Sequence, residues 1–333
     1  MSNFAKKHQI LSQLSDGEFY SGQALGESLG ISRAAVGKHI KQLEDIGLDI
    51  FSVTGKGYKL AAPLRLLDET KITANTNRTS NDWLEVHHVI DSTNDHMLEQ
   101  IRAGQSIYGK AMDNGHTVVA ECQTAGRGRR GRSWISPFGS HIYFSYLWHL
   151  DGIGQAMGLS VAVGLALRET IAEFIDSSSK ATLKWPNDVY VDGKKIAGIL
   201  VELEGQADGP CEVVIGIGIN VNMPAKSAEQ IDQPWTDLSS YSDDAVNRNL
   251  FIAKLCNSLY RQMEAFAAEG LSPLVSQWNE HDYFYQQDVK LIMGNHETHG
   301  VCQGIDRQGG LVLTLKDGNT RSFYGGEISV RKG

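Results

Sequence analysis

A run of arginine and glycine, residues 121–134 (ECQTAGRGRRGRSW), is the stretch of this sequence best suited to chemistry. Its four arginines, set among three glycines, are Arg127, Arg129, Arg130 and Arg132. Guanidinium groups bind phosphates and carboxylates through paired hydrogen bonds, and glycine lets the backbone come close to a ligand. Four neighbouring cations also repel one another. We therefore expect a mobile lid that becomes ordered when an anion neutralises it.

Two other interpretations of this run are less favourable. A basic run is often a solvated face, but glycine at every second or third position weakens both helices and strands. Gly126, Gly128 and Gly131 also match the G-x-G-x-x-G fingerprint of dinucleotide-binding folds. That fingerprint needs a helix to begin at the glycines, whereas SWISPFG follows them here. We reject the dinucleotide-binding fold and keep a functional loop.

Composition predicts a soluble protein of two or three domains. The chain has 333 residues, of which 41% are hydrophobic and 21% are charged, as in ordinary globular proteins. No apolar run approaches the ~18 residues of a membrane helix, and the first residues, MSNFAKKH, lack the apolar region of a signal peptide. We therefore expect a cytoplasmic protein with no membrane partner.

The four cysteines lie far apart without C-x-x-C spacing, at Cys122, Cys211, Cys256 and Cys302. We expect reduced thiols, with neither disulfides nor a zinc site. Cys122 ends an apolar strand beside the arginine run, where a cysteine is more often buried and inert than a nucleophile. The HETH sequence at residues 296–299 has the wrong spacing for the H-E-x-x-H zinc motif.

Residues 1–62 differ from the rest of the chain in charge and pattern. They carry seven Lys and Arg against six Asp and Glu, whereas the remainder carries 24 against 33. Helices are expected at residues 4–14, at 21–29 and from 32 to about 47, followed by two strands around the turn at 54–57. This order predicts a winged helix-turn-helix domain.

Small three-helix units without a DNA-binding function share this helix pattern, but the wing and the basic balance favour DNA binding. The predicted DNA-binding residues lie at the start of the last helix, off its apolar stripe or on the wing, and they are Ser32, Arg33, Lys38, Lys41, Gln42 and Lys56.

Residues 82–284 predict a central domain that contains a sheet. Strands are expected at residues 83–90, 117–122, 141–148, 182–191, 195–202 and 212–220, with a buried helix at 158–175. The arginine run joins two of these strands, and Asp192-Gly193 predicts a hairpin turn. The DSTN run at 91–94 would cap a helix, whose free N–H groups could also hold a carbonyl or carboxylate of a ligand.

The end of the chain changes to short strands after amphipathic helices between residues 249 and 280. Strands at 289–293, 299–306, 311–316 and 320–324 predict a small SH3-like β-barrel. The predicted fold class is therefore α+β and multidomain. Its parts are a winged helix-turn-helix at 1–62, a linker at 63–81, a central mixed-sheet domain at 82–284 and the barrel at 285–333.

Five motifs behind the winged helix resemble those of the bacterial biotin protein ligases that double as biotin operon repressors. They are Ser92-Thr93-Asn94, the arginine run, KWPND at 184–188, KIAGILVE at 195–202 and GIGIN at 216–220. The resemblance covers nearly the whole chain, and five motifs in order are far more specific than any one of them. It implies a class II synthetase-like biotin/lipoate ligase fold for the central domain, with ATP, biotin and Mg²⁺ as ligands.

In that family, ATP converts biotin to biotinyl-5'-adenylate, and biotin then passes to a lysine of the biotin carboxyl carrier protein of acetyl-CoA carboxylase. The resemblance implies that biotin is bound by Ser92, Thr93, Asn94, Gln123, Arg127, Gly128, Arg129 and Lys195. The catalytic residues among these would be Lys195, Arg129 and Arg127.

The same resemblance implies nucleotide contacts from Asn187, Asp188, Asn220 and Trp235, with Asp188 as a magnesium ligand and Trp134 in the same pocket. Residues 223–235 depart from the family's pattern, which leaves the nucleotide contacts of that loop open.

The resemblance also implies repression through operator DNA, bound by a homodimer that forms when biotinyl-5'-adenylate is present. One exposed edge of the central sheet would serve both the homodimer and the carrier protein, so that the two interactions exclude each other. A lipoate or octanoate transfer enzyme with the same central fold is a rival, disfavoured by the winged helix and the arginine run. A non-catalytic repressor that senses a metabolite is another, disfavoured by Lys195 and Arg129.

Overall fold

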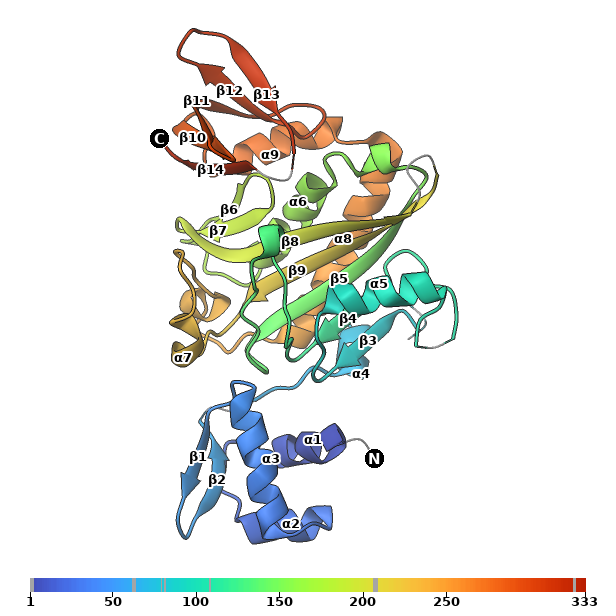
Figure 1. Cartoon of the computed structure of the whole chain (residues 1–333), viewed down its shortest axis with the longest axis vertical. Coiled ribbons are helices and arrows are strands. Elements are labelled where there is room, and N and C mark those ends of the chain that lie inside the picture. The colour runs from blue at the N-terminus through green and yellow to red at the C-terminus, as the bar shows by residue number, and fades with distance from the viewer. Residues whose placement is uncertain are drawn as a thin grey trace.

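The protein has three structural units arranged along its length (Figure 1). The structure is a computed structural model that describes residues 3–61, 64–78, 80, 82–107, 109–205, 209–325 and 328–333. The two ends of the chain lie at opposite ends of the molecule, with the N-terminal helices on one side of the central sheet domain and the C-terminal strands on the other. The predicted multidomain α+β fold is confirmed.

The N-terminal unit is a winged helix-turn-helix, as predicted. Its elements are α1 (Asn3–Leu14), α2 (Gly22–Leu29), α3 (Arg33–Asp45), β1 (Ile50–Val53) and β2 (Gly57–Leu60). Ser21 and Ser32 cap α2 and α3, because their hydroxyl oxygens accept hydrogen bonds from the backbone N–H groups of Ala24 and Ala35. Between them Gly30 adopts φ 64°, the left-handed conformation that ends a helix and that glycine adopts without strain.

The central unit is a seven-stranded mixed sheet in the order β3-β4-β5-β9-β8-β7-β6. Its strands are β3 (Leu84–His87), β4 (Thr117–Ala120), β5 (His141–Leu150), β6 (Ala181–Lys184), β7 (Asp188–Val191), β8 (Lys194–Gly205) and β9 (Cys211–Asn220). Among the strands that the structure describes in this sheet, only the β3–β4 pair is parallel. The long strands β5, β9 and β8 form the middle of the sheet, so their residues supply the floor on which a site can be built.

One strand prediction was wrong. Residues 182–191 form two antiparallel strands, β6 and β7, and the chain reverses between them at Trp185, Pro186 and Asn187. The Trp185–Pro186 peptide bond is cis. Proline cannot donate a ladder hydrogen bond, which is why the apparently continuous pattern is interrupted there. The turn brings Asn187 and Asp188 together at one end of the sheet, while the predicted Asp192-Gly193 hairpin follows between β7 and β8.

Helices cover both faces of the sheet. On one face lie α6 (Leu159–Ala172) and α8 (Arg248–Glu269), which pack on each other and on the inward side chains of the strands. On the other lies α5 (Thr93–Ala103). The remaining helical elements are α4 (Glu69–Thr73), α7 (Ala225–Ala228), α9 (Val275–His281), η1 (Arg129–Gly131), η2 (Ile153–Ala156), η3 (Leu238–Tyr241) and η4 (Ser272–Leu274).

The C-terminal unit is a five-stranded antiparallel sheet in the order β13-β12-β11-β10-β14. Its strands are β10 (Asp288–Met293), β11 (His296–Ile305), β12 (Leu311–Leu315), β13 (Thr320–Phe323) and β14 (Ile328–Lys332). The last strand was not predicted, because only six residues, 328–333, remain at the end of the chain after the Gly-Gly-Glu sequence at 325–327. The buried hydrophobic residues of these five strands belong to the same core as the central sheet, so the C-terminal and central units pack together.

The four cysteines are free thiols and all are buried. Burial raises the pKa of Cys122 to about 12, with a further contribution from the charge of Glu121, so this thiol stays protonated. Among the described residues, no helix combines the length and the apolar character needed to cross a membrane.

The predicted linker, residues 63–81, contains the short helix α4. Residues 62, 63, 79 and 81, on which its boundaries fall, lie outside the described residues. Within it, α4 is anchored to α8: Asp68 N donates to Asn249 Oδ1 at 2.9 Å, and Ile72 is completely buried. The described part of the segment therefore packs against the central unit.

A buried ion pair fastens this segment to the sheet. Arg248, at the start of α8, donates to Glu121 Oε2 at 2.7 Å and to the carbonyl oxygens of His141 and Arg65 at 3.1 and 2.7 Å. Glu121 also accepts a hydrogen bond from Leu67 N. Both charged side chains are almost completely buried, so removal of either one leaves an uncompensated charge in the core.

We therefore expect Arg248→Met to lower the free energy of unfolding by about 3–5 kcal/mol. The measurement is chemical denaturation followed by tryptophan fluorescence, which reports on the central unit because all six tryptophans lie between residues 83 and 278. Arg261→Met is the matched control. It breaks an exposed ion pair with Glu169 and should cost less than about 1 kcal/mol. Equal losses in the two variants would contradict this account.

Candidate functional site

The eight residues predicted to bind biotin all line one cavity. It lies on the face of the sheet that α5 covers, between the start of α5, the arginine loop (residues 121–134) and strands β8 and β9. Its lining includes Ser92, Thr93, Asn94, Gln123, Arg127, Gly128, Arg129 and Lys195. The structure therefore brings together side chains that are more than 100 residues apart in the sequence.

The inner wall of this cavity is polar and firmly held. Ser92 caps α5, and the Thr93 backbone N–H and hydroxyl both donate to Gln123 Oε1, at 2.9 and 3.1 Å. Ser145 on β5 donates to Thr93 Oγ1 at 2.8 Å and to Asn94 Oδ1 at 2.5 Å. Because Ser92, Thr93 and Asn94 are nearly inaccessible to solvent, these bonds hold the side chains in one arrangement.

Two glycines of β9 make room for the cavity walls. A Cβ atom on Gly216 would lie 2.4 Å from Asn94 Oδ1, and one on Gly218 would lie 2.4 Å from Trp134 Cε2. Neither contact is possible without displacement of the wall. The GIGIN motif is thus explained by close approach of side chains to the sheet, not by a turn.

Arg127 is clamped between two carboxylates. Its Nε donates to Asp95 Oδ2 at 3.0 Å, its Nη1 and Nη2 each donate to Glu202 at 2.9 Å, and Nη2 also bonds Asp95 Oδ1. Glu202 in turn accepts from Asn94 Nδ2 at 2.8 Å. Burial alone would lower the pKa of Arg127, but the hydrogen bonds to Glu202 and Asp95 raise it. Arg127 is therefore better suited to holding the loop than to neutralising a phosphate.

The loop is folded on itself as a short hairpin. Gly128 N donates to Arg132 O at 2.7 Å and Trp134 N donates to Gly126 O at 2.8 Å. At its tip Arg130 adopts φ 61°, a conformation that costs a non-glycine residue about 1 kcal/mol or more. The expectation of a loop ordered only by an anion omitted Asp95 and Glu202, which supply two negative charges from within the chain.

Arg129 is the second arginine of the loop that lines the first cavity. Arg129 Nη1 donates to the neutral amide oxygen of Asn187 at 2.8 Å, and Asn187 Nδ2 donates to Ile199 O at 2.7 Å. Burial lowers the pKa of Arg129, and the nearby charge of Arg130 lowers it further. Burial also lowers the pKa of Lys184 on β6. Both cations line cavities of this region, where they can contribute to the binding of an anion.

Lys195 stands where the cavities meet. Its ammonium lies 2.6 Å from Asp188 Oδ1 and 5.4 Å from the centroid of the Trp134 ring. A second cavity is lined by Trp134, Lys195, Asn220 and Trp235, and a third by Trp134, Lys195, Asn187 and Asp188. All three cavities share Trp134 and Lys195.

The second cavity is held together by backbone pairing. Trp235 follows Pro234, whose carbonyl oxygen accepts from Lys195 N at 3.2 Å, and Asn220 Nδ2 donates to Thr236 O at 3.0 Å. The buried indole N–H of Trp134 has no hydrogen-bond partner in the part of the chain that the structure describes. A buried donor beside a cavity is a natural contact for a ligand acceptor.

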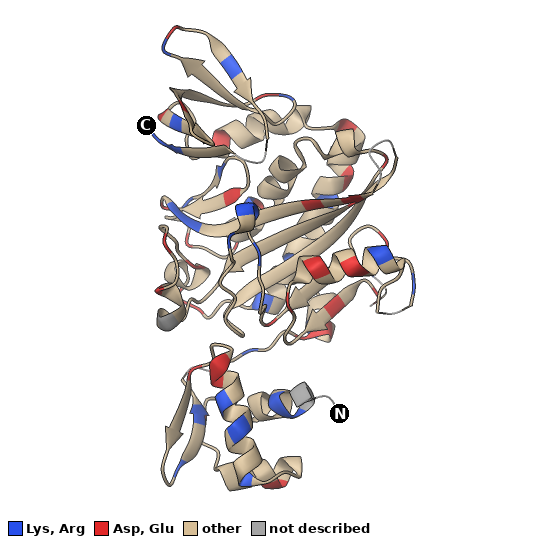
Figure 2. Cartoon of the chain, in the orientation of Figure 1, with Lys and Arg blue, Asp and Glu red and all other residues tan. Residues whose placement is uncertain are grey.

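The predicted DNA-binding residues are grouped on one unit, remote from these cavities. Ser32, Arg33, Lys38 and Lys41 are exposed on or beside α3, and Lys56 is exposed at the turn between β1 and β2. Gln42 is half-buried. Figure 2 shows Lys and Arg on α3 and on the β1–β2 pair, whereas Asp and Glu follow α5 and β8 in the central unit.

Comparison with known proteins agrees with each of these units. The sequence pattern of the Biotin/lipoate A/B protein ligase family matches residues 86–220, that of an HTH domain matches residues 6–59, and that of the Biotin protein ligase C terminal domain matches residues 287–331.

Relatives of similar length extend the likeness over the whole chain. The Bifunctional ligase/repressor BirA of Salmonella typhimurium is 44% identical over 97% of this chain and 96% of its own. That of Escherichia coli is 42% identical over the same shares. Among solved structures, the Biotin protein ligase from Aquifex aeolicus in complex with biotin and ATP superposes with a TM-score of 0.61 and 27% identity, covering 75% of this chain and 99% of that one. The chain therefore belongs to the biotin/lipoate A/B protein ligase family and, within it, to the bifunctional ligase/repressors.

Proposed function

We propose that this protein joins biotin to a carrier protein at the expense of ATP and represses transcription when it holds biotinyl-5'-adenylate. The observation that carries the proposal is the meeting of three cavities at Lys195 and Trp134. A ligand made of two parts joined through a phosphate fits this arrangement. The first cavity would hold the ureido head of biotin, the second the adenosine, and the junction the reacting atoms.

In the first reaction, a carboxylate oxygen of biotin attacks the α-phosphorus of ATP, and pyrophosphate leaves. Negative charge on the phosphorus oxygens grows during this step, so cations that are already positioned accelerate it. Lys195 stands at the junction, and Arg129 lines the first and third cavities beside it. Asp188 holds the Lys195 ammonium in place, and Asn187 does the same for the Arg129 guanidinium.

The donor groups around Asp188 fit a magnesium ion that arrives with the triphosphate. Mg²⁺ in nucleotide sites takes one or two carboxylates and fills its coordination with phosphate oxygens and water. Asp188 is such a carboxylate and lines the third cavity, while both polar atoms of the Asn187 amide are already bonded. The ion would offset charge on the leaving pyrophosphate.

In the second reaction, a lysine amine of the carrier protein attacks the carbonyl carbon of the adenylate, an amide bond forms and AMP leaves. The mixed anhydride must be kept from water until then. The arginine loop, anchored by Arg127, covers the cavity in which the anhydride would lie. The need to exclude water accounts for a glycine-rich loop that covers this cavity.

The edge of β8 suits a partner that adds a strand. Beyond Gly198, where pairing with β7 ends, residues 200–205 pair only with β9 among the strands described. Leu203 is exposed on this edge. Unpaired backbone groups beside the cavity can bind either the carrier domain or the same edge of a second protomer, but not both at once. The edge supports an adenylate-dependent homodimer that competes with the carrier.

The reaction is tested by exchange of labelled pyrophosphate into ATP. We expect exchange that depends on biotin and not on lipoate. Lys195→Gln should lower the exchange rate about 100- to 1,000-fold, because it removes a charge that acts in the transition state. The control Lys194→Gln, an exposed neighbour on the same strand, should exchange normally.

Lipoate-dependent exchange would assign the protein to the lipoate ligases instead. Absence of exchange with either acid would contradict the enzymatic proposal and favour a repressor that only senses its ligand.

The DNA binding that repression requires is tested with a mixed-sequence DNA duplex at low salt, where phosphate contacts dominate the affinity. Reversing two charges on α3, in Arg33→Glu with Lys38→Glu, should weaken binding at least about tenfold and reduce the salt slope by about two. The control reverses two exposed charges of the central unit, in Lys71→Glu with Lys110→Glu, and changes the net charge equally. Equal weakening in both double variants would indicate that α3 is not the DNA-binding element.

A further inference from the structure

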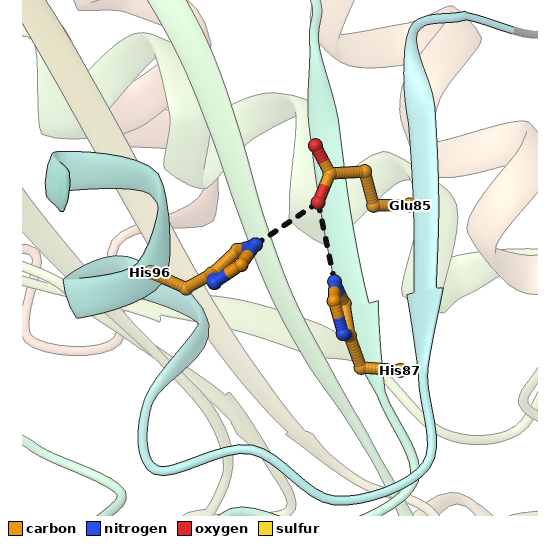
Figure 3. Close-up of side chains that lie close together, drawn as sticks. All are labelled: Glu85, His87 and His96. Carbon is orange, nitrogen blue, oxygen red and sulfur yellow. Dashed lines mark hydrogen bonds and ion pairs between the residues drawn. The ribbon is translucent and has the colours of Figure 1, made fainter. Parts of the chain in front are cut away.

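A cluster of histidines surrounds a buried carboxylate away from the cavities just described. Glu85 on β3 accepts hydrogen bonds at Oε2 from His87 Nε2 at 3.2 Å and from His96 Nε2 at 3.0 Å (Figure 3). His87 lies two residues further along the same strand, and His96 lies on α5. One nitrogen of each ring and one carboxylate oxygen of Glu85 all lie within 4.8 Å of one another.

The other oxygen of Glu85 has partners of its own. Oε1 lies 3.0 Å from His116 Nε2 and accepts from Gln100 Nε2 at 2.8 Å. Gln100 Nε2 also lies 3.1 Å from Oε2 and 3.1 Å from His96 Nε2. His116 is 2% exposed and the Glu85 carboxylate is completely buried. Burial would raise the pKa of Glu85, but the hydrogen bonds from His116, His87 and His96 hold it well below its usual range. Glu85 is therefore a fixed anion that points one oxygen at two imidazoles.

We propose that Glu85, His87 and His96 form a binding site for a divalent transition-metal ion of the Zn²⁺ type. Zinc binds nitrogen and oxygen at about 2.0–2.1 Å, and two ligands of a tetrahedron with such bonds are separated by about 3.3 Å. The separations of Glu85 Oε2 from the two imidazole nitrogens, 3.0 and 3.2 Å, are close to this value. The two imidazole rings are partly exposed, so a small shift of the rings would make room for the ion between the three ligand atoms.

The surroundings match those of known metal sites in two further respects. Metal ligands are usually oriented by an outer shell of hydrogen bonds. His116 and Gln100 supply such bonds to Glu85 Oε1, the oxygen that does not face the imidazoles of His87 and His96. The side chains of His87 and His96 are 25% and 22% exposed, so solvent reaches one side of the site. Two imidazoles and a carboxylate with an open fourth position favour zinc, cobalt or nickel over magnesium or calcium.

The ion would join β3 to α5, the helix whose first residues line the first cavity. It would tie α5 to β3 at His96, the residue after Asp95, which anchors Arg127. The expectation from sequence of no zinc site rested on cysteine spacing. The proposed ligands come from a strand and a helix, so cysteine spacing could not indicate them.

The test uses the untagged full-length protein after removal of metals by chelation. We expect saturable binding of one Zn²⁺ per chain in calorimetry, and a tetrahedral absorption spectrum with one equivalent of Co²⁺. Zinc should also raise the Tm, and the increase should grow with the logarithm of its concentration above Kd, because zinc binds only the folded state. His87→Gln and His96→Gln should each weaken zinc binding by more than the roughly 10- to 100-fold typical of outer-shell changes.

Both substituted rings are partly exposed, so the variants are expected to fold, and circular dichroism checks this. His299→Gln is the matched control: His299 also faces a carboxylate, that of Glu297 at 3.8 Å, but has no second histidine ligand there in the described chain. Zinc binding that survives in folded His87→Gln and His96→Gln, or no saturable binding by the wild type, would overturn the proposal. In the latter case the cluster would be a hydrogen-bond network that balances Glu85.

Discussion

The clamp of Arg127 between Asp95 and Glu202 is the interaction on which the site depends. A loop that carries four arginines cannot close over a cavity by itself, because its charges repel one another and gain too little from burial. Two carboxylates, one from α5 and one from β8, neutralise the arginine at the base of the loop. The loop is thereby fixed to both walls of the cavity, and Arg129 lines the same cavity.

The sheet supplies the other half of the arrangement. Its central strands carry Gly216 and Gly218 where Asn94 and Trp134 approach most closely, and Lys195 stands at the start of β8 beside Asp188. Rigid strands position these groups more accurately than loops can, which matters because catalytic electrostatics depends on distances that do not change during the reaction. The winged helix packs in a second hydrophobic cluster, which also includes Cys122 and Phe138 of the central unit.

Features determined by local chemistry could be predicted from the sequence, and features determined by distant partners could not. Serine caps, the Asp192-Gly193 hairpin and the short C-terminal strands each follow from neighbouring residues. Asp95 and Glu202 lie 32 and 75 residues from Arg127, and nothing in their own surroundings marks them as its partners. The division of residues 182–191 into two strands was obscured by an apolar pattern that continues on both sides of Pro186.

The most direct test of this account is the rate at which biotinyl-5'-adenylate leaves the protein when Asp95 is changed to Asn. The Asp95 side chain contacts the base of the loop, so the clamp would lose one of its two carboxylates. We predict release several-fold faster than from the wild type, which corresponds to about 1 kcal/mol for a partly exposed ion pair. Glu99→Gln, an exposed residue on the same helix, should release the adenylate at the wild-type rate. An unchanged rate in Asp95→Asn would contradict the role of the clamp in holding the loop closed.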